Sequence, residues 1–126
     1  MNQFDLKNRT AVITGGAQGF GFDIAKRFLQ SGSKVIIWDI DENELSKASK
    51  ELNNSNLSFN TVDVSNYNQV KEVANQIIKK SNIDILINNA GITGSTASVW
   101  EYDVEEWSKI VNINLMGTFN CCKCIV

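Results

Sequence analysis

Short runs of β-branched and apolar residues alternate with amphipathic helical patterns along the chain, and this alternation restricts its fold more than any other feature. Runs typical of buried strands cover residues 10–14, 34–39, 57–62 and 83–87. Apolar stripes typical of helices follow the first three runs, and a long helical pattern continues from about residue 105 to the end. Strand and helix repeat about every 25 residues, which is typical of a parallel sheet with crossover helices on both faces.

Right-handed crossovers order the four strands as 3-2-1-4. We therefore predict a single α/β domain over residues 1–126, whose doubly wound parallel sheet ends after its fourth strand and the long helix. Gly32 is predicted to end the first helix, and Asp41 and Ser65 to cap the next two. Ligands of such sheets bind at the carboxyl ends of the strands, near the switch point between strands 1 and 4.

The composition of the 126 residues excludes several classes of function. The net charge is −2, and the near-neutral balance argues against nucleic acid as the main partner. The chain has no histidine, which excludes imidazole-based catalysis and removes a common zinc ligand. The N-terminus lacks the apolar core of a secretory signal, and no apolar run is long enough to span a bilayer. We therefore expect a cytoplasmic protein with no membrane partner.

Three cysteines lie together near the end of the chain: Cys121, Cys122 and Cys124. The spacing of Cys121 and Cys124 is that of a C-x-x-C motif, which leaves a redox or metal role open. A four-ligand zinc site would need a further cysteine or a histidine, and the sequence has neither. We interpret the three side chains as small apolar packing residues of a helix, and predict no metal site.

A glycine-rich segment, TGGAQGFG at residues 14–21, comes directly after the first strand and opens the first helix. Glycines at these positions permit a tight turn, a close approach of the backbone to a pyrophosphate and close packing of helix on strand. Free amides at the start of the helix, with the helix dipole, favour phosphate. The cofactor-binding residues predicted here are Gly15, Gln18, Gly19, Phe20 and Gly21. A purely structural turn is the alternative.

Asp39 ends the second strand, 24 residues after Gly15. A carboxylate at this place can accept hydrogen bonds from both hydroxyls of an adenosine ribose, and it would repel a 2′-phosphate. Neither Gln18 nor Ile40 supplies a positive charge that could bind such a phosphate. The pattern therefore favours NAD as the cofactor over NADP. The alternative role for Asp39 is to cap the following helix.

The chain resembles the classical short-chain dehydrogenase/reductase family over essentially its whole length. The motifs that carry the resemblance, in the family's order and spacing, are TGGAQGFG (14–21), Asp39, Asp63-Val64, NNAG (88–91) and VNINLMG (111–117). The resemblance implies a Rossmann-type NAD(P)-binding domain. It also implies hydride transfer between nicotinamide and a carbonyl or secondary alcohol, with 3-oxoacyl reduction and sugar or alcohol oxidation equally open. Phe20 departs from the family's smaller aliphatic residue, at a position that contributes chiefly backbone.

The resemblance also implies roles for individual residues around the cofactor. Asp63 and Val64 would hold the adenine ring, with Asp63 at its amino group. The residues that would line the ribose side of the adenosine are Asn89, Ala90 and Gly91. Asn88 would tie the central strands together. Asn114 matches the family's supporting active-site asparagine, which holds a water next to the catalytic lysine.

The family's catalytic serine and Tyr-x-x-x-Lys pair lie beyond its long helix, and nothing in this sequence matches them there. The resemblance therefore implies the N-terminal half of a family member, inactive by itself. Tyr67 and Lys71 have the catalytic spacing but precede the NNAG motif, so we interpret them as surface residues. A non-catalytic nucleotide-binding module, or one piece of a split protein, is the alternative. The final helix is apolar on two sides, which predicts a homo-oligomer formed through it.

Overall fold

The computed structural model describes residues 3–126. Its core is a four-stranded sheet in the order β3-β2-β1-β4, which confirms the predicted topology. The strands are β1 (Thr10–Thr14), β2 (Lys34–Asp39), β3 (Leu57–Thr61) and β4 (Ile85–Ile87), and every pairing between them is parallel. β4 is shorter than predicted because it pairs only with the centre of β1, from Ala11 to Ile13.

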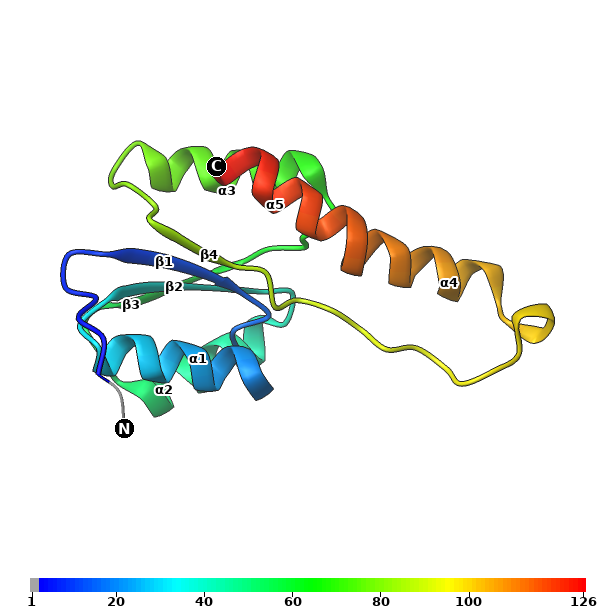
Figure 1. Ribbon diagram of the computed structural model, residues 1–126, viewed down its shortest axis with the longest axis horizontal. Helices are drawn as coiled ribbons and strands as arrows, with labels where there is room; N and C mark the ends of the chain where they lie inside the picture. The colour runs from blue at the N-terminus through cyan, green and yellow to red at the C-terminus, as the bar shows by residue number, and fades with distance from the viewer. Residues whose placement is uncertain (1–2) are drawn as a thin grey trace.

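Helices cover both faces of the sheet. α1 (Gly19–Gln30) and α2 (Glu42–Leu52) lie on one face, and α3 (Tyr67–Ile78) and α5 (Gly117–Ile125) lie on the other (Figure 1). Alternate residues of the strands supply two separate cores. Ile13, Val35 and Ile37 pack against α1 and α2, whereas Val12, Ile36 and Trp38 pack on the side of α3 and α5. The doubly wound architecture is thus present as predicted.

The helix ends follow local hydrogen bonding. Asp41 caps α2 by accepting a hydrogen bond from the amide of Glu44, as predicted. Gly32 follows α1 with a φ of 90°, the left-handed conformation typical of a residue that ends a helix. The prediction for the third helix was wrong by one residue. Asn66, and not Ser65, caps α3, because its side chain accepts the hydrogen bond from the amide of Gln69.

The long helix predicted from about residue 105 has three parts. α4 (Val104–Val111) continues into a π-helical segment, Asn112–Met116, and then into α5. The α4 end projects beyond the sheet, alongside the segment that follows β4 (Figure 1). That segment contains a short 3-10 turn, Val99–Glu101. Of the helices in residues 3–126, none has the length and apolar character needed to cross a membrane.

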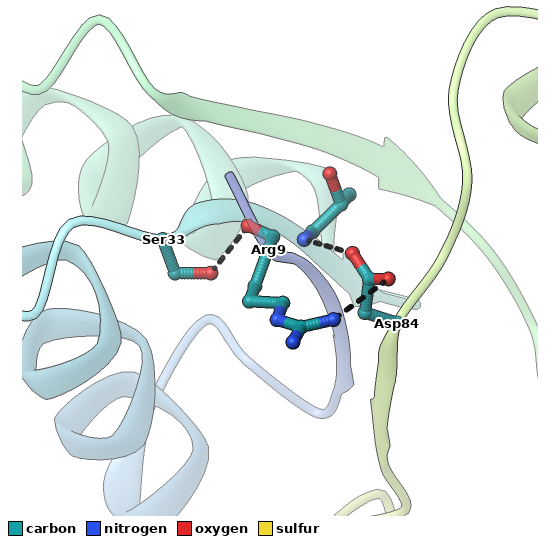
Figure 2. Close-up of polar contacts among 4 residues, drawn as sticks. Arg9, Ser33 and Asp84 are labelled. Carbon is teal, nitrogen blue, oxygen red and sulfur yellow. Dashed lines mark hydrogen bonds and ion pairs between the residues drawn. The ribbon is translucent and has the colours of Figure 1, made fainter. Parts of the chain in front are cut away.

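Polar contacts hold together the amino ends of three strands, away from the edge where ligands are expected (Figure 2). The amide of Thr10 donates to the Asp84 carboxylate at 2.9 Å, and the Arg9 guanidinium lies 3.7 Å from the other oxygen of that carboxylate. The Ser33 hydroxyl donates to the carbonyl oxygen of Arg9 at 3.0 Å. Since Arg9 is 62% exposed, its ion pair adds little to stability, and the bonds to backbone atoms fix the register.

Candidate adenosine-binding site

The carboxyl ends of the four strands lead into the segments that carry the predicted binding residues. β1 leads into the glycine-rich turn, β2 ends at Asp39, β3 is followed by Asp63, and β4 is followed by residues 88–91. Because all four strands are parallel, these segments meet at one edge of the sheet.

The glycine-rich turn has a backbone that side chains would obstruct. Gly15 and Gly19 have φ angles of 63° and 58°, in the left-handed region that glycine adopts without strain. A Cβ on Gly21 would overlap the carbonyl oxygen of Gly15 and lie 2.6 Å from Nδ2 of Asn89. The first turn of α1 has no acidic residue, and the side chain of Gln18 makes no capping bond. Within the described residues, no side chain therefore caps the amides that open α1.

The Asp39 carboxylate joins the end of β2 to this turn. One oxygen accepts a hydrogen bond from the amide of Ala17 at 3.2 Å, and the other accepts one from the amide of Asp41 at 3.2 Å. Asp39 therefore faces the glycine-rich turn. The alternative role, capping of α2, belongs to Asp41.

Thr14 and Asn89 join the end of β4 to the end of β1. The Thr14 hydroxyl oxygen accepts hydrogen bonds from the amides of Asn89 and Ala90, both at 3.0 Å. The Asn89 side-chain amide donates to the carbonyl oxygen of Gly15 at 3.1 Å. The tie between the central strands, expected of Asn88, is thus made by Asn89. Asn88 instead points its amide at the sulfur of Cys122 on α5, 3.4 Å away.

A pocket lies at this edge between the ends of the strands and the long helix. Six of its lining residues were predicted from the sequence: Gly15, Asp39, Asp63, Val64, Ala90 and Gly91. Five were not predicted: Trp38, Ile40, Val62, Ile92 and Ile113. Ile40 directly follows Asp39, and Ile92 directly follows Gly91. Their position next to predicted binding residues is the sequence feature that could have identified them. Ile113 reaches the pocket from the π-helical segment, and only the tertiary fold places it there.

The remaining predicted residues lie beside the pocket. Gln18, Gly19 and Phe20 are exposed on the glycine-rich turn, and Phe20 keeps 83% of its surface accessible. Gly21 is buried where α1 meets the turn. The structure therefore separates an apolar pocket that holds two carboxylates from a turn whose helix-opening amides have no side-chain cap. This arrangement suits a ligand with a flat ring at one end and a phosphate at the other.

Asp63 is held by three short contacts. Its Oδ1 accepts hydrogen bonds from the amide of Ser65 at 3.0 Å and from the Ser65 hydroxyl at 2.6 Å. Its own amide donates to the side-chain oxygen of Gln69 at 2.7 Å. The Asp63 carboxylate is therefore fixed at the boundary between β3 and α3.

Asn114 uses both ends of its side-chain amide on the backbone of Ile92. Its Nδ2 donates to the Ile92 carbonyl at 2.8 Å, and its Oδ1 accepts from the Ile92 amide at 2.9 Å. The backbone carbonyl oxygen of Asn114 accepts a hydrogen bond from the Thr118 hydroxyl at 3.1 Å. Asn114 thus fixes the segment after β4 against the π-helical part of the long helix.

Tyr67 and Lys71 lie on α3, and neither lines the pocket. All three cysteines are unpaired. Cys121 is fully buried in the core, as the packing interpretation predicts, and burial raises its pKa to about 12. Burial also raises the pKa of Cys124. Among residues 3–126, no three metal-ligating side chains converge on one point.

Comparison with known proteins connects this site to a family. The family model described as short chain dehydrogenase matches residues 9–126. The chain is 38% identical over 125 residues to a 3-oxoacyl-[acyl-carrier-protein] reductase of Chlamydia trachomatis, covering 96% of this chain and 50% of that protein.

Two solved structures extend the comparison to the fold. A short-chain dehydrogenase/reductase of Brucella melitensis, described as glucose/ribitol dehydrogenase, superposes with a TM-score of 0.91 at 28% identity, over 98% of this chain and 53% of that one. The Pseudomonas aeruginosa RhlG/NADP active-site complex superposes with a TM-score of 0.86 at 29% identity, over 96% and 48%. The chain spans about half the length of these relatives. With the glycine-rich turn, the two carboxylates and the match over residues 9–126 in agreement, the chain belongs to the short-chain dehydrogenase family of oxidoreductases.

Proposed function

We propose that this chain binds the adenosine half of NAD at the carboxyl edge of its sheet. Members of the family bind nicotinamide dinucleotide cofactors and small-molecule substrates. The observation that carries the proposal is the position of Asp39, which bonds to the glycine-rich turn and lines the same pocket as Asp63. The pyrophosphate then lies on the amides that open α1, the ribose hydroxyls on Asp39, and the adenine between the apolar walls of the pocket.

The same carboxylate favours NAD over NADP. No lysine or arginine lines the pocket within residues 3–126, so nothing there offsets the charge of Asp39 against a 2′-phosphate. At about 4 Å and an effective dielectric constant of about 20, one such charge pair costs about 4 kcal/mol. That energy corresponds to roughly a thousandfold in affinity. The Pseudomonas aeruginosa relative was solved as a complex with NADP, and that cofactor is a finding about the relative and not about this chain.

Calorimetric titration with NAD, NADP and AMP tests both proposals. We expect NAD and AMP to bind and NADP to bind far more weakly. The Asp39→Asn variant keeps a side-chain oxygen but loses the charge. It should therefore bind NAD more weakly than the unchanged chain does, and the difference in affinity between NAD and NADP should become smaller. Equal affinity of the unchanged chain for NAD and NADP would remove the selective role of Asp39.

For a complete family member that contains this chain, we propose hydride transfer between the nicotinamide of NAD and a carbonyl or secondary alcohol. Bound NAD supplies the hydride acceptor or donor, and the protein orients it. A 3-oxoacyl reductase and a sugar or alcohol dehydrogenase are both compatible with the site. Asn114 supports the active site by fixing the segment after β4.

Residues 1–126 contain one Tyr-x-x-x-Lys, at Tyr67 and Lys71, and it lies outside the pocket. We therefore propose that residues 1–126 by themselves bind the cofactor but do not catalyse its reaction. We also propose that the protein is located in the cytoplasm. An assay with NAD and broad panels of alcohols and ketones tests this, and clear turnover would contradict it.

The second candidate is a non-catalytic nucleotide-binding module, or one piece of a protein completed by another polypeptide. The observation that favours it is the uncovered apolar surface of the long helix, where Leu115 is 65% and Phe119 is 53% exposed. We propose that a second copy of the chain covers this surface and forms a homo-oligomer. The reading frame downstream of residue 126 separates the candidates. A frame that encodes the catalytic serine and Tyr-x-x-x-Lys favours the enzyme, and a stop favours the module.

A further inference from the structure

The pocket holds two carboxylates, and their places in the sheet give them different partners. Asp39 ends β2, next to β1, and bonds to the glycine-rich turn. Asp63 follows β3, one strand further from that turn. If the phosphates of a dinucleotide lie on the turn, its adenosine ribose therefore lies next to Asp39. Its adenine base then lies one strand further away, next to Asp63.

Only one group of adenine can bond to a carboxylate at that position. The ring nitrogens of adenine in a nucleotide are acceptors, and the exocyclic amino group is its one strong donor. An ionised carboxylate only accepts hydrogen bonds. Ile40, Val62 and Ile113 supply apolar walls for a flat ring. A base in this pocket would therefore meet Asp63 through its amino group, the contact that the family resemblance implies.

The Asp63 carboxylate is oriented by its neighbour two residues on. Both donors of Ser65, its amide and its hydroxyl, converge on the same oxygen, Oδ1. In the part of the chain that the structure describes, no hydrogen bond reaches Oδ2. Two donors on one oxygen fix the rotation of the carboxyl group, which leaves Oδ2 as its available acceptor.

We propose that Ser65 is a positioning residue that sets the preference of this site for an amino-bearing purine, by holding the Asp63 carboxylate with Oδ2 available to the base. The proposal rests on the proposed function, since it needs NAD in this pocket. The amide of Ser65 can hold Oδ1 without the hydroxyl, but one donor leaves the carboxyl group able to rotate. The Ser65 hydroxyl therefore acts on the choice of base more than on the fold.

The test compares NAD with nicotinamide hypoxanthine dinucleotide, which carries a carbonyl oxygen in place of the adenine amino group. Calorimetry should show the unchanged chain preferring NAD by about tenfold or more, the loss expected when a hydrogen bond to a charged group is removed. In Ser65→Ala this preference should fall by about threefold or more, mainly through weaker NAD binding. Ser65→Thr keeps the hydroxyl and should restore the preference.

Asn66→Ala is the matched control, because it removes the cap of α3 next to Ser65 and leaves both bonds to Asp63 in place. It should lower the stability of the chain and keep the preference for NAD. If Ser65→Ala keeps the full preference, or if Asn66→Ala loses it equally, the role of Ser65 is overturned while the proposed function stands. If the unchanged chain binds neither dinucleotide, the proposed function fails and this inference with it.

Discussion

Two glycines of the turn differ in what prevents a side chain at their positions. A Cβ on Gly19 would meet nothing within 4 Å, although the φ of 58° is strained for other residues. At Gly21 the Cβ would overlap the Gly15 carbonyl. We therefore expect Gly19→Ala to cost about 1–2 kcal/mol of stability through backbone strain alone. Gly21→Ala should cost more, because α1 must move away from β1 and take the turn with it.

Denaturant unfolding and NAD titration of both variants measure this difference. Gly19→Ala should stay folded and bind NAD more weakly, since the proposed function places the phosphates on this exposed turn. Gly21→Ala should lose both stability and binding. Equal losses of stability in the two variants would mean that the close contact of helix and turn has no energetic weight.

Burial of the Cys121 thiol makes stability depend on pH in the alkaline range. Burial, with smaller contributions from Cys122 and Cys124, raises its pKa in the folded chain to about 12. The unfolded chain, with the ordinary pKa of 9.0, then loses this proton first as the pH rises. The contribution of Cys121 is therefore intact below about pH 9 and is lost progressively above it.

Unfolding of the unchanged chain and of Cys121→Ala at about pH 8 and about pH 10.5 checks the sign. The variant should be less stable at the lower pH because it loses packing atoms. Between the two pH values, the stability of the variant should fall less than the stability of the unchanged chain. Other alkaline titrations occur in both chains and cancel in the comparison, so parallel slopes would exclude Cys121 as the source.

The segment after β4 is held against α4 as one element. Both the amide and the hydroxyl of Ser95 donate to Oε1 of Glu106 at 2.7 Å. Tyr102 and Trp107 form an edge-to-face pair with ring centroids 5.6 Å apart. The projecting end of the long helix and this segment therefore support each other, although both lie outside the two cores (Figure 1).

Glu106→Ala should release the segment locally. Removing the acceptor of a charge-assisted hydrogen bond should speed hydrogen exchange at the Ser95 amide by about tenfold or more. Glu105→Ala changes the neighbouring glutamate of α4, whose side chain makes no hydrogen bond within residues 3–126, and serves as the control. Global stability should change little in either variant. Unchanged exchange at Ser95 would show that other contacts hold the segment.

Local sequence predicted the elements better than the contacts between them. Asp41 is predicted to cap a helix because Glu44 follows it by three residues at the start of a helical pattern, and that signal is local. Ser65 and Asn66 are both good capping residues, and the choice between them depends on Ser65 being engaged by Asp63. Similarly, Asn88 and Asn89 are identical in type, and their roles are set by alternation along the chain after β4.

At the scale of the whole molecule, the long helix leaves apolar surface uncovered. Val104, Trp107, Leu115 and Phe119 are all more than half exposed. Apolar surface of this kind promotes association. We expect the unchanged chain to form a dimer or larger species in light scattering, and the double variant Leu115→Ser with Phe119→Ser to shift toward monomer.

Phe4→Ser is the control for this experiment, because Phe4 is 68% exposed but lies at the other end of the chain. It should leave the association unchanged. A monodisperse monomer of the unchanged chain, or an equal effect of the Phe4 variant, would contradict the proposed interface.

The alternation of strand and helix patterns was enough to establish the parallel sheet and its order, and the glycines directly after the first strand predict the edge where ligands bind. These features depend on local periodicity and on the fixed handedness of crossovers. Which side chains meet at that edge was decided by the tertiary structure. Ile113 lines the pocket beside Gly15, and Asp39 bonds to the amide of Ala17, because the fold brings together elements that are distant in the chain. Such contacts depend on packing in three dimensions, which periodicity along the chain does not encode.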